Sequence, residues 1–354
     1  MSLYVDKHRP SELKQLTHSK SLTSQLMKLG SSLDLPHLLI YGPSGVGKKT
    51  RILALLKQIF GNSVEKIKID QRVFQTPAGK RLELVVCSSN YHIEITPSDV
   101  GIYDRVVVQD LIKELAQTQQ VDVNSKRSFK VVVINEAHNL SKDAQHGLRR
   151  TMEKYMGNLR VILCSNSTSR ILSPIRSRCL LIRVASPSIN EICDILFEIS
   201  EKECLNLPEK LSQRIAVYCN GNLRRALLIL ECLRVKQFPL SSDMEIVTTD
   251  WEDFLESVAL MIVEEQSPQR LLLVRGKLYE ALAHCIPAEV ILKTLTLLIL
   301  EKIDDNFKVE FVKEAALYDH RLRLGTKHIM HLEAFVAKFM TMYKKYLVEL
   351  MSDF

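Results

Sequence analysis

A glycine-rich segment followed by lysine is the part of this sequence best suited to chemistry. Residues 42–50 read Gly-Pro-Ser-Gly-Val-Gly-Lys-Lys-Thr, which fits the pattern G-x-x-x-x-G-K. In such a loop, backbone N–H groups surround phosphate oxygens and the lysine reaches the β- and γ-phosphates. The alternative is an ordinary glycine-rich turn. The residues predicted to bind nucleotide here are Gly42, Pro43, Ser44, Gly45, Val46, Gly47, Lys48, Lys49 and Thr50.

The position after Lys48 departs from the pattern. It should be Ser or Thr, whose hydroxyl binds Mg²⁺, but it is Lys49. An ammonium group has three donors and no lone pair, and its positive charge repels a divalent cation. Thr50 does not replace the missing hydroxyl, because one residue corresponds to about 100° around a helix.

A second departure lies in the acidic motif. The apolar run 130–134 ends in Asn135 and Glu136, where hydrolysing enzymes of this kind place Asp-Glu. Asn135 lacks the negative charge that helps to hold the metal, whereas Glu136 remains a candidate base. We therefore expect bound ATP or ADP, Mg²⁺ weak or absent, and little hydrolysis. The alternative is that both substitutions are tolerated in a working ATPase.

Alternating strand-like and helix-like segments position these residues in the first half of the chain. Residues 37–41 form a short apolar strand before the loop, and residues 47–60 have helical apolar spacing. This alternation predicts an α/β domain with a mainly parallel sheet. Further strands are expected at 66–69, 82–86, 91–95, 130–134, 161–164 and 180–184, and helices at 104–117 and 142–155.

After Pro187 the pattern is wholly helical. We divide the chain into an α/β nucleotide-binding domain (1–186), a three-helix group (187–237) and an all-α domain (238–354). The last domain offers no catalytic constellation, so we expect it to serve packing or assembly. The predicted helices are 190–203, 208–218, 222–233, 251–265, 269–284, 289–303, 308–318 and 327–349.

The composition is that of an ordinary globular protein, with 46% hydrophobic and 25% charged residues. The formal charge of +7 is compatible with a polyanionic partner but does not require one. The eight cysteines form no C-x-x-C pair, so no metal site is expected. The first residues are too polar for a signal peptide and the apolar run 290–300 is too short for a membrane span, so no membrane association is expected.

Five segments, in order, resemble the small subunits of the replication factor C clamp loader, which are AAA+ ATPases. Residues 4–10 are similar to the family's W-V-x-K-Y-R-P box, with Tyr4 and His8 as substitutions. One small subunit of that family also combines a G-K-K-T loop with an altered acidic motif. The other similar segments are 144–153 (A-Q-x-A-L-R-R-T-M-E), 175–179 (Ser-Arg-Cys), 221–225 (second sensor) and 325–337 (collar helix).

The resemblance implies a fold and a set of partners. The expected fold is an AAA+ α/β domain followed by a three-helix lid and an all-α collar. The expected partners are the other replication factor C subunits in a heteropentamer, the sliding clamp PCNA, and primer–template DNA bound through its backbone. The subunit would also join alternative clamp loaders with other large subunits, including those of checkpoint signalling. The implied location is the nucleus, and the implied processes are DNA replication and repair.

The resemblance also assigns single residues. Arg178, in the Ser-Arg-Cys segment, resembles the arginine finger that reaches the ATP of a neighbouring subunit. Asn166 resembles the first sensor and Arg224 the second, although a turn-forming Asn and a solvated Arg are the local alternatives. Tyr4 and Arg9, in the first box, are added to the predicted nucleotide site.

Basic residues of the α/β domain are the candidates for DNA contact. Such contacts would be to the backbone, independent of sequence and sensitive to salt. Arg149 and Arg150 could instead serve a subunit interface. Two rival functions stay open, an independently active AAA+ ATPase and an assembly scaffold without nucleotide. The candidates for DNA binding are Lys80, Arg81, Arg105, Lys113, Lys126, Arg127, Arg149 and Arg150.

Overall fold

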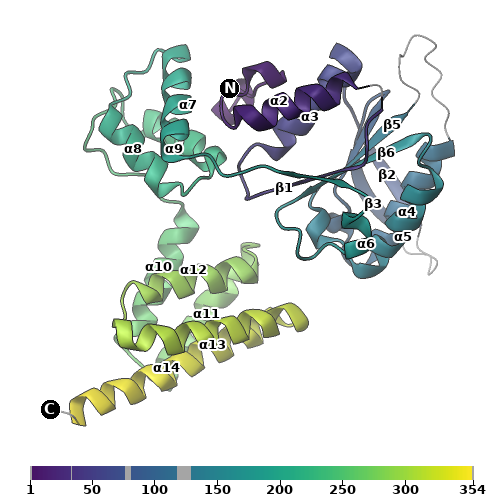
Figure 1. Ribbon diagram of the computed structural model, residues 1–354. Helices are drawn as coiled ribbons and strands as arrows, with labels where there is room; N and C mark the ends of the chain where they lie inside the picture. Colours follow the sequence, from purple (N-terminus) through teal and green to yellow (C-terminus); the bar gives the residue numbers. More distant parts are fainter. Residues whose placement is uncertain (1, 33, 76–80, 118–128, 353–354) are drawn as a thin grey trace. The chain divides into compact units, whose positions relative to one another are not determined.

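The computed structural model describes residues 2–32, 34–75, 81–117 and 129–352. The chain divides into two compact units, Met1–Ile246 and Val247–Phe354. Figure 1 shows a sheet with flanking helices and a small helical group in the first unit, and helices alone in the second.

A mixed, mostly parallel sheet forms the centre of the first unit. Among the described residues it has seven strands in the order β2-β3-β4-β5-β6-β1-β7. The strands from β4 to β7 pair in parallel, whereas β2 and β3 are antiparallel at one edge. This confirms the predicted mainly parallel sheet. The strands are β1 (Leu38–Tyr41), β2 (Lys68–Gln75), β3 (Arg81–Ser88), β4 (His92–Ile95), β5 (Lys130–Ile134), β6 (Leu159–Ser165) and β7 (Leu180–Arg183).

Successive residues of the central strands point to opposite faces of the sheet and belong to two separate hydrophobic cores, one on each face. In β1, Leu39 packs with α4 and α5, whereas Leu38 and Ile40 pack with α2 and α3. Strands covered on both faces are expected to be continuously apolar, as β5 is. The helices of this part are α1 (Tyr4–Lys7), α2 (Lys20–Ser31), α3 (Lys48–Phe60), α4 (Asp104–Gln117), α5 (Lys142–Lys154) and α6 (Ser173–Arg176). Helix α2, rich in serine, was not predicted.

The three-helix group follows the sheet as α7 (Ile189–Lys202), α8 (Glu209–Tyr218) and α9 (Leu223–Lys236). Helix α7 begins with a capping box, in which Ser188 and Glu191 satisfy each other's backbone N–H. The side chain of Asn222 accepts from the N–H of Arg225 and caps α9. These caps fix where the helices begin, close to the predicted positions.

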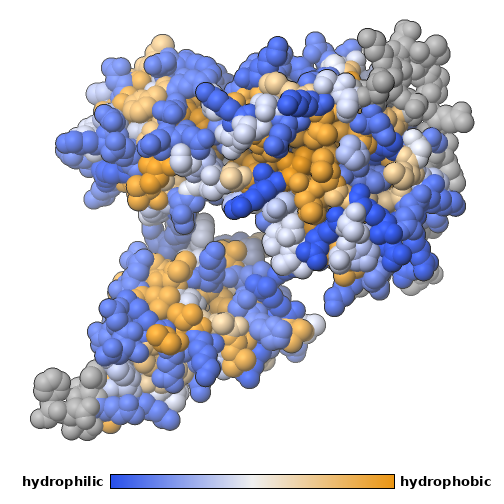
Figure 2. All heavy atoms as spheres, in the orientation of Figure 1, coloured by the Kyte–Doolittle hydropathy of each residue, from blue (hydrophilic) through white to orange (hydrophobic). Residues whose placement is uncertain are grey.

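Five helices form the second unit within the described residues. Its core contains a cluster of aromatic rings, with the Phe311 and Phe339 centroids 5.0 Å apart. Figure 2 shows that apolar residues also lie on the surface of this unit. Leu272, Leu273 and Val309 are among the exposed ones. The helices are α10 (Asp250–Glu264), α11 (Pro268–Ala283), α12 (Ala288–Leu300), α13 (Asp305–Leu324) and α14 (His328–Ser352).

Candidate nucleotide site

The glycine-rich loop joins the end of β1 to the start of α3. Gly45 and Gly47 have φ values of +75° and +84°, a left-handed conformation that glycine adopts without steric cost. A Cβ atom at Gly45 would also lie 1.7 Å from Oδ1 of Asn222, at the start of α9. The loop therefore requires glycine for its own path and for the approach of the lid. Its amides lie at the N-terminus of α3, where unpaired N–H groups attract anions.

The ammonium of Lys48 lies inside the loop. Its Nζ donates to Gly42 O at 2.8 Å, Pro43 O at 2.6 Å and Asn166 Oδ1 at 2.9 Å. Lys48 is 8% exposed, and burial lowers the pKa of its ammonium, as does the positive charge of Arg224 to a smaller extent. The Lys48 ammonium is thus held by three neutral oxygens, one of which is the side-chain oxygen of Asn166.

Lys49 contacts the sheet, whereas Thr50 lines the cavity described below. Its Nζ forms an ion pair with Glu94 of β4. Asn135, at the end of β5, donates from Nδ2 to the same Glu94 oxygen at 2.6 Å. The sequence analysis missed Glu94. The signal that could have found it is a single acidic residue between the two isoleucines of this short strand, Ile93 and Ile95.

Glu136 follows Asn135 with its side chain exposed. Its Oε2 accepts from Asn139 Nδ2 at 3.1 Å and from Ser98 Oγ at 3.4 Å. Its φ of +49° is uncommon for a residue with a side chain, and such conformations cluster at functional sites.

The pKa of the buried Cys164 thiol responds to the charges of this site. Burial raises the pKa of this thiol. The charges of Lys48 and Lys49 lower it, whereas those of Glu94 and Glu136 raise it further. All four charged groups therefore act on one small region at the ends of the parallel strands.

A cavity of about 730 Å³ lies between the N-terminal segment, the loop and the lid. Arg9, Thr50 and Arg224 line it, and Arg224 N donates to Gly45 O at 3.3 Å. The volume is in the range typical of small-molecule sites. Tyr4 is buried against α9, where its N–H donates to Glu231 Oε2 at 3.0 Å, and the neighbouring Val5 lines the cavity.

Arg178 lies just after α6. Its Nη1 donates to Pro174 O at 2.6 Å, and its Nη2 forms an ion pair with Glu153 of α5. Arg149 Nε also donates to Glu153, at 3.4 Å. The Arg178 guanidinium is therefore held at the surface by α5 and α6, and not by α3, which follows the glycine-rich loop.

The candidate DNA-binding residues occupy neighbouring elements. Arg105 and Lys113 lie on α4, and Arg149 and Arg150 on α5, which packs against α4 (Figure 1). Arg81 begins β3. Lys80, Lys126 and Arg127 lie outside the described residues.

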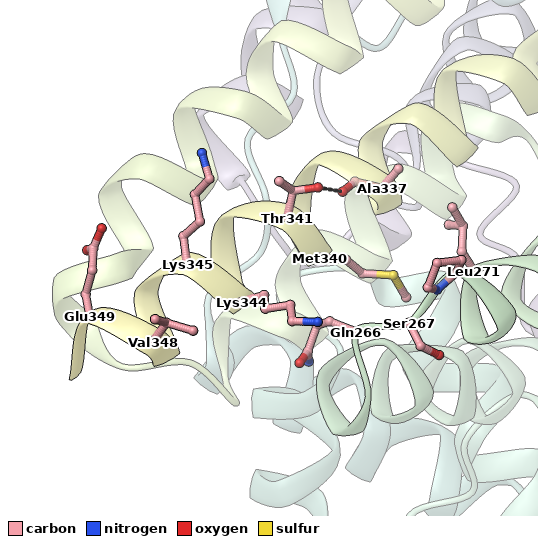
Figure 3. Close-up of a pocket in the computed structure, with 11 residues that line it drawn as sticks. Gln266, Ser267, Leu271, Ala337, Met340, Thr341, Lys344, Lys345, Val348 and Glu349 are labelled. Atoms are coloured by element: carbon pink, nitrogen blue, oxygen red, sulfur yellow. Dashed lines mark hydrogen bonds between the residues drawn. The ribbon is translucent and has the colours of Figure 1, made fainter. Parts of the chain in front are cut away.

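The second unit contains a groove of about 530 Å³ along α14 and the start of α11. Figure 3 shows the side chains that line it, with the hydroxyl of Thr341 donating to Ala337 O at 2.8 Å. Its lining combines apolar residues with polar and charged ones, among them Lys344, Lys345 and Glu349. In the described part of the chain, no three His, Cys, Asp or Glu residues could together hold a metal ion. No helix there is long and apolar enough to span a bilayer. The glycine-rich loop and the residues around it belong to the first unit.

Comparison with known proteins agrees with this architecture. Residues 251–347 match the family described as replication factor C subunit 3, C-terminal domain. Residues 194–235 match the RCF1/5-like AAA+ ATPase lid domain, and residues 20–188 match the delta subunit of DNA polymerase III. A solved RuvB structure from Thermotoga maritima shares the fold, with a TM-score of 0.53 and 16% identity over 83% of this chain and 91% of that one.

The fold and the site together define an AAA+ protein, a class whose fold implies nucleotide binding. The chain is 53% identical to human replication factor C subunit 3 over 347 residues, 98% of each chain. It is 55% identical to Neurospora crassa replication factor C subunit 5 over 350 residues, 99% of each. The chain belongs to this family of replication factor C subunits, numbered 3 or 5.

Proposed function

We propose that the chain is a clamp-loader subunit that binds nucleotide, hydrolyses little or none of it at its own site, and helps to load PCNA onto primer–template DNA. The relatives are named as replication factor C subunits, and the two altered metal-facing positions distinguish this chain from an ordinary ATPase. The proposal places it in a nuclear heteropentamer that acts in replication and repair. Alternative loaders with other large subunits would share it.

The single observation that carries the proposal is the ion pair of Lys49. A hydrolysing site needs oxygen donors around Mg²⁺, from a hydroxyl and an acidic side chain. Here an ammonium stands at the hydroxyl position, and the nearby carboxylate of Glu94 is already paired with it. Asn135 is hydrogen bonded to the same carboxylate. The donor set does not fit Mg²⁺.

Nucleotide would be held by the loop amides and by Lys48. The three acceptors now around the Lys48 ammonium are neutral oxygens. Phosphate oxygens carry negative charge, so exchanging carbonyl partners for them strengthens the hydrogen bonds of a buried cation. Arg9, Thr50 and Arg224 would line the part of the cavity that takes the rest of the nucleotide. Asn166 would lie near the terminal phosphate.

Catalysis in trans is the second part of the proposal. Arg178 would act as an arginine finger at the nucleotide of a neighbouring subunit, where a planar guanidinium suits a phosphoryl group that gains charge. The exposed apolar residues of the second unit support a role in assembly. The three-part division at residues 186 and 237 stays a prediction, with the second boundary near the division between the two units. Contacts of DNA with α4 and α5 likewise stay a prediction.

The test is to purify the full chain in EDTA and to measure both retained nucleotide and turnover. We expect ATP or ADP to remain bound, detected by mass spectrometry. We expect ATP turnover with Mg²⁺ to lie far below the ~1 s⁻¹ of ordinary enzymes, because the metal is not held.

The two rivals give different results. An independently active ATPase would turn over near that ordinary rate, and a pure scaffold would retain no nucleotide and bind none when it is added. A Lys48→Ala variant serves as the control. It should release nucleotide both in EDTA and in the presence of Mg²⁺.

A further inference from the structure

The two altered positions meet at one side chain. Lys49 Nζ and Asn135 Nδ2 both contact Oε1 of Glu94. The parallel pairing of β4 with β5 brings them together, since Ile95 lies opposite Ile134 and Asn135 N donates to Ile95 O at 2.9 Å. Register therefore places the acidic residue of β4 beside the end of β5.

The three residue types are chemically matched. Glu94 is 7% exposed, and a buried carboxylate requires a charged or hydrogen-bonding partner. The amide of Asn135 donates to it, which an ionised aspartate could not do. An aspartate at this position would instead place two like charges side by side, which is unfavourable. Lys49 then neutralises the one remaining carboxylate.

We propose that Glu94 is a positioning residue that holds the Lys49 ammonium beside the loop as a resident cation, so that the site takes nucleotide in its metal-free form. The inference rests on the proposed function and adds the residue that enforces it. An ammonium has three donors, and Lys49 is 45% exposed, so donors remain for a phosphate oxygen.

Replacing Lys49 should change how the site responds to Mg²⁺. With Lys49 replaced by threonine, the Glu94 carboxylate would be uncovered next to a hydroxyl and near Glu136. Carboxylate and hydroxyl oxygens are the donors that Mg²⁺ prefers. The variant should therefore gain a response to Mg²⁺ that depends on Glu94.

The experiment measures ADP binding to the full chain by calorimetry, in EDTA and in excess MgCl₂. For the wild type we expect the two dissociation constants to agree within about twofold, whereas Lys49→Thr should bind at least about tenfold more weakly in EDTA, the effect of one lost charge-assisted hydrogen bond. Mg²⁺ should recover that loss in Lys49→Thr but much less in Lys49→Thr/Glu94→Gln.

Lys57→Thr is the matched control. Lys57 lies on the same helix as Lys49, eight positions further from the loop, and its Nζ is paired with Glu65 Oε1 at 2.7 Å. Its loss should leave both constants unchanged. A second readout needs no nucleotide. In this readout the chain is acetylated with a limiting amount of reagent, and the modified lysines are measured by mass spectrometry. In Glu94→Gln, acetylation of Lys49 should rise several-fold relative to that of Lys57, because the Lys49 amine is no longer held by the Glu94 carboxylate.

The outcomes separate the two proposals. If none of the proteins binds ADP in either condition, the proposed function fails and this inference with it. If all bind ADP, but Mg²⁺ acts equally on Lys49→Thr with and without Glu94, the inference alone is wrong. Unchanged acetylation of Lys49 in Glu94→Gln would also overturn it. Should Lys49→Thr not fold, Lys49→Met tests the loss of metal-free affinity.

Discussion

At the scale of the residue, Arg178 shows how a side chain can be held and still be available. Its ion pair with Glu153 is at the surface, and both side chains are partly exposed. The guanidinium of Arg149 and that of Arg178 both hold the pKa of the Glu153 carboxyl below its usual range. Surface ion pairs contribute little to stability because water screens them. Arg178 could therefore exchange Glu153 for a phosphate at small cost.

We predict that Arg178→Ala, in the assembled five-subunit complex, slows ATP hydrolysis at the neighbouring site by about 10³-fold or more. Clamp loading should fall with it, whereas nucleotide binding to this chain should not change. The measurements are steady-state ATPase and loading of labelled clamp. Arg183→Ala, an exposed arginine on β7, is the control. Normal loading by the Arg178→Ala complex would remove the assignment.

At the scale of the element, the start of β1 depends on an uncharged histidine. Val161 N donates to His37 Nδ1 at 3.0 Å, which joins the residue before β1 to β6. Burial lowers the pKa of His37, and the positive charge of Arg160 lowers it further. A protonated Nδ1 could not accept this bond. Protonation therefore favours the unfolded chain, in which His37 has an ordinary pKa.

The contribution of neutral His37 to the free energy of unfolding depends on pH. The stabilising contribution is complete above the unfolded pKa of 6.5 and is lost as pH falls below it. We predict that His37→Gln, whose amide oxygen can still accept, flattens the fall in unfolding free energy between pH 7.5 and 5.5 by at most about 1.4 kcal/mol per pH unit. Urea unfolding monitored by circular dichroism is the measurement.

The exposed His284 provides the comparison, and His284→Gln should leave the pH dependence as it is. Two further histidines, His18 and His92, also have pKa values lowered by burial, so part of the dependence should persist in His37→Gln. A pH dependence identical to that of the wild type would contradict the role given to His37.

At the scale of the whole molecule, the two units have separate cores. The sheet packs with its own helices in two clusters, and the second unit has a third cluster built on aromatic rings. Phe311 is 1% exposed at the centre of that third cluster. Each unit therefore carries its own source of stability, and nucleotide binding depends on the first.

We predict that Phe311→Ala destabilises the second unit by about 3–5 kcal/mol, the usual cost of removing a buried aromatic side chain. Calorimetry should show an unfolding transition of that unit at lower temperature. ADP affinity should stay within about twofold of the wild type, as expected for sites that belong to separate cores and share no partners. Assembly with the other subunits should weaken. A parallel loss of ADP binding would show that the units are not independent.

Sequence alone predicted most of the elements and the loop, because apolar periodicity and glycine punctuation are local properties, whereas the serine-rich helix α2 was missed. The strand before Gly42, the helix after it and the departures from the motifs at Lys49 and Asn135 were all visible without coordinates. The mainly parallel sheet and the helical second half were confirmed. The roles assigned to Arg178, Asn166 and Arg224 stay predictions.

Tertiary structure alone decided which residues meet. Glu94 and Lys49 are 45 positions apart, and no local pattern connects them. Their contact depends on the packing of α3 against the sheet, since Lys49 lies on α3 and Glu94 on β4, whereas the register of β4 with β5 brings Asn135 to the same carboxylate. The contact of Tyr4 with α9 likewise joins residues far apart in the sequence, and the role of Tyr4 at the nucleotide stays a prediction. Contacts of this kind depend on long-range pairing and burial, which spacing along a chain does not encode.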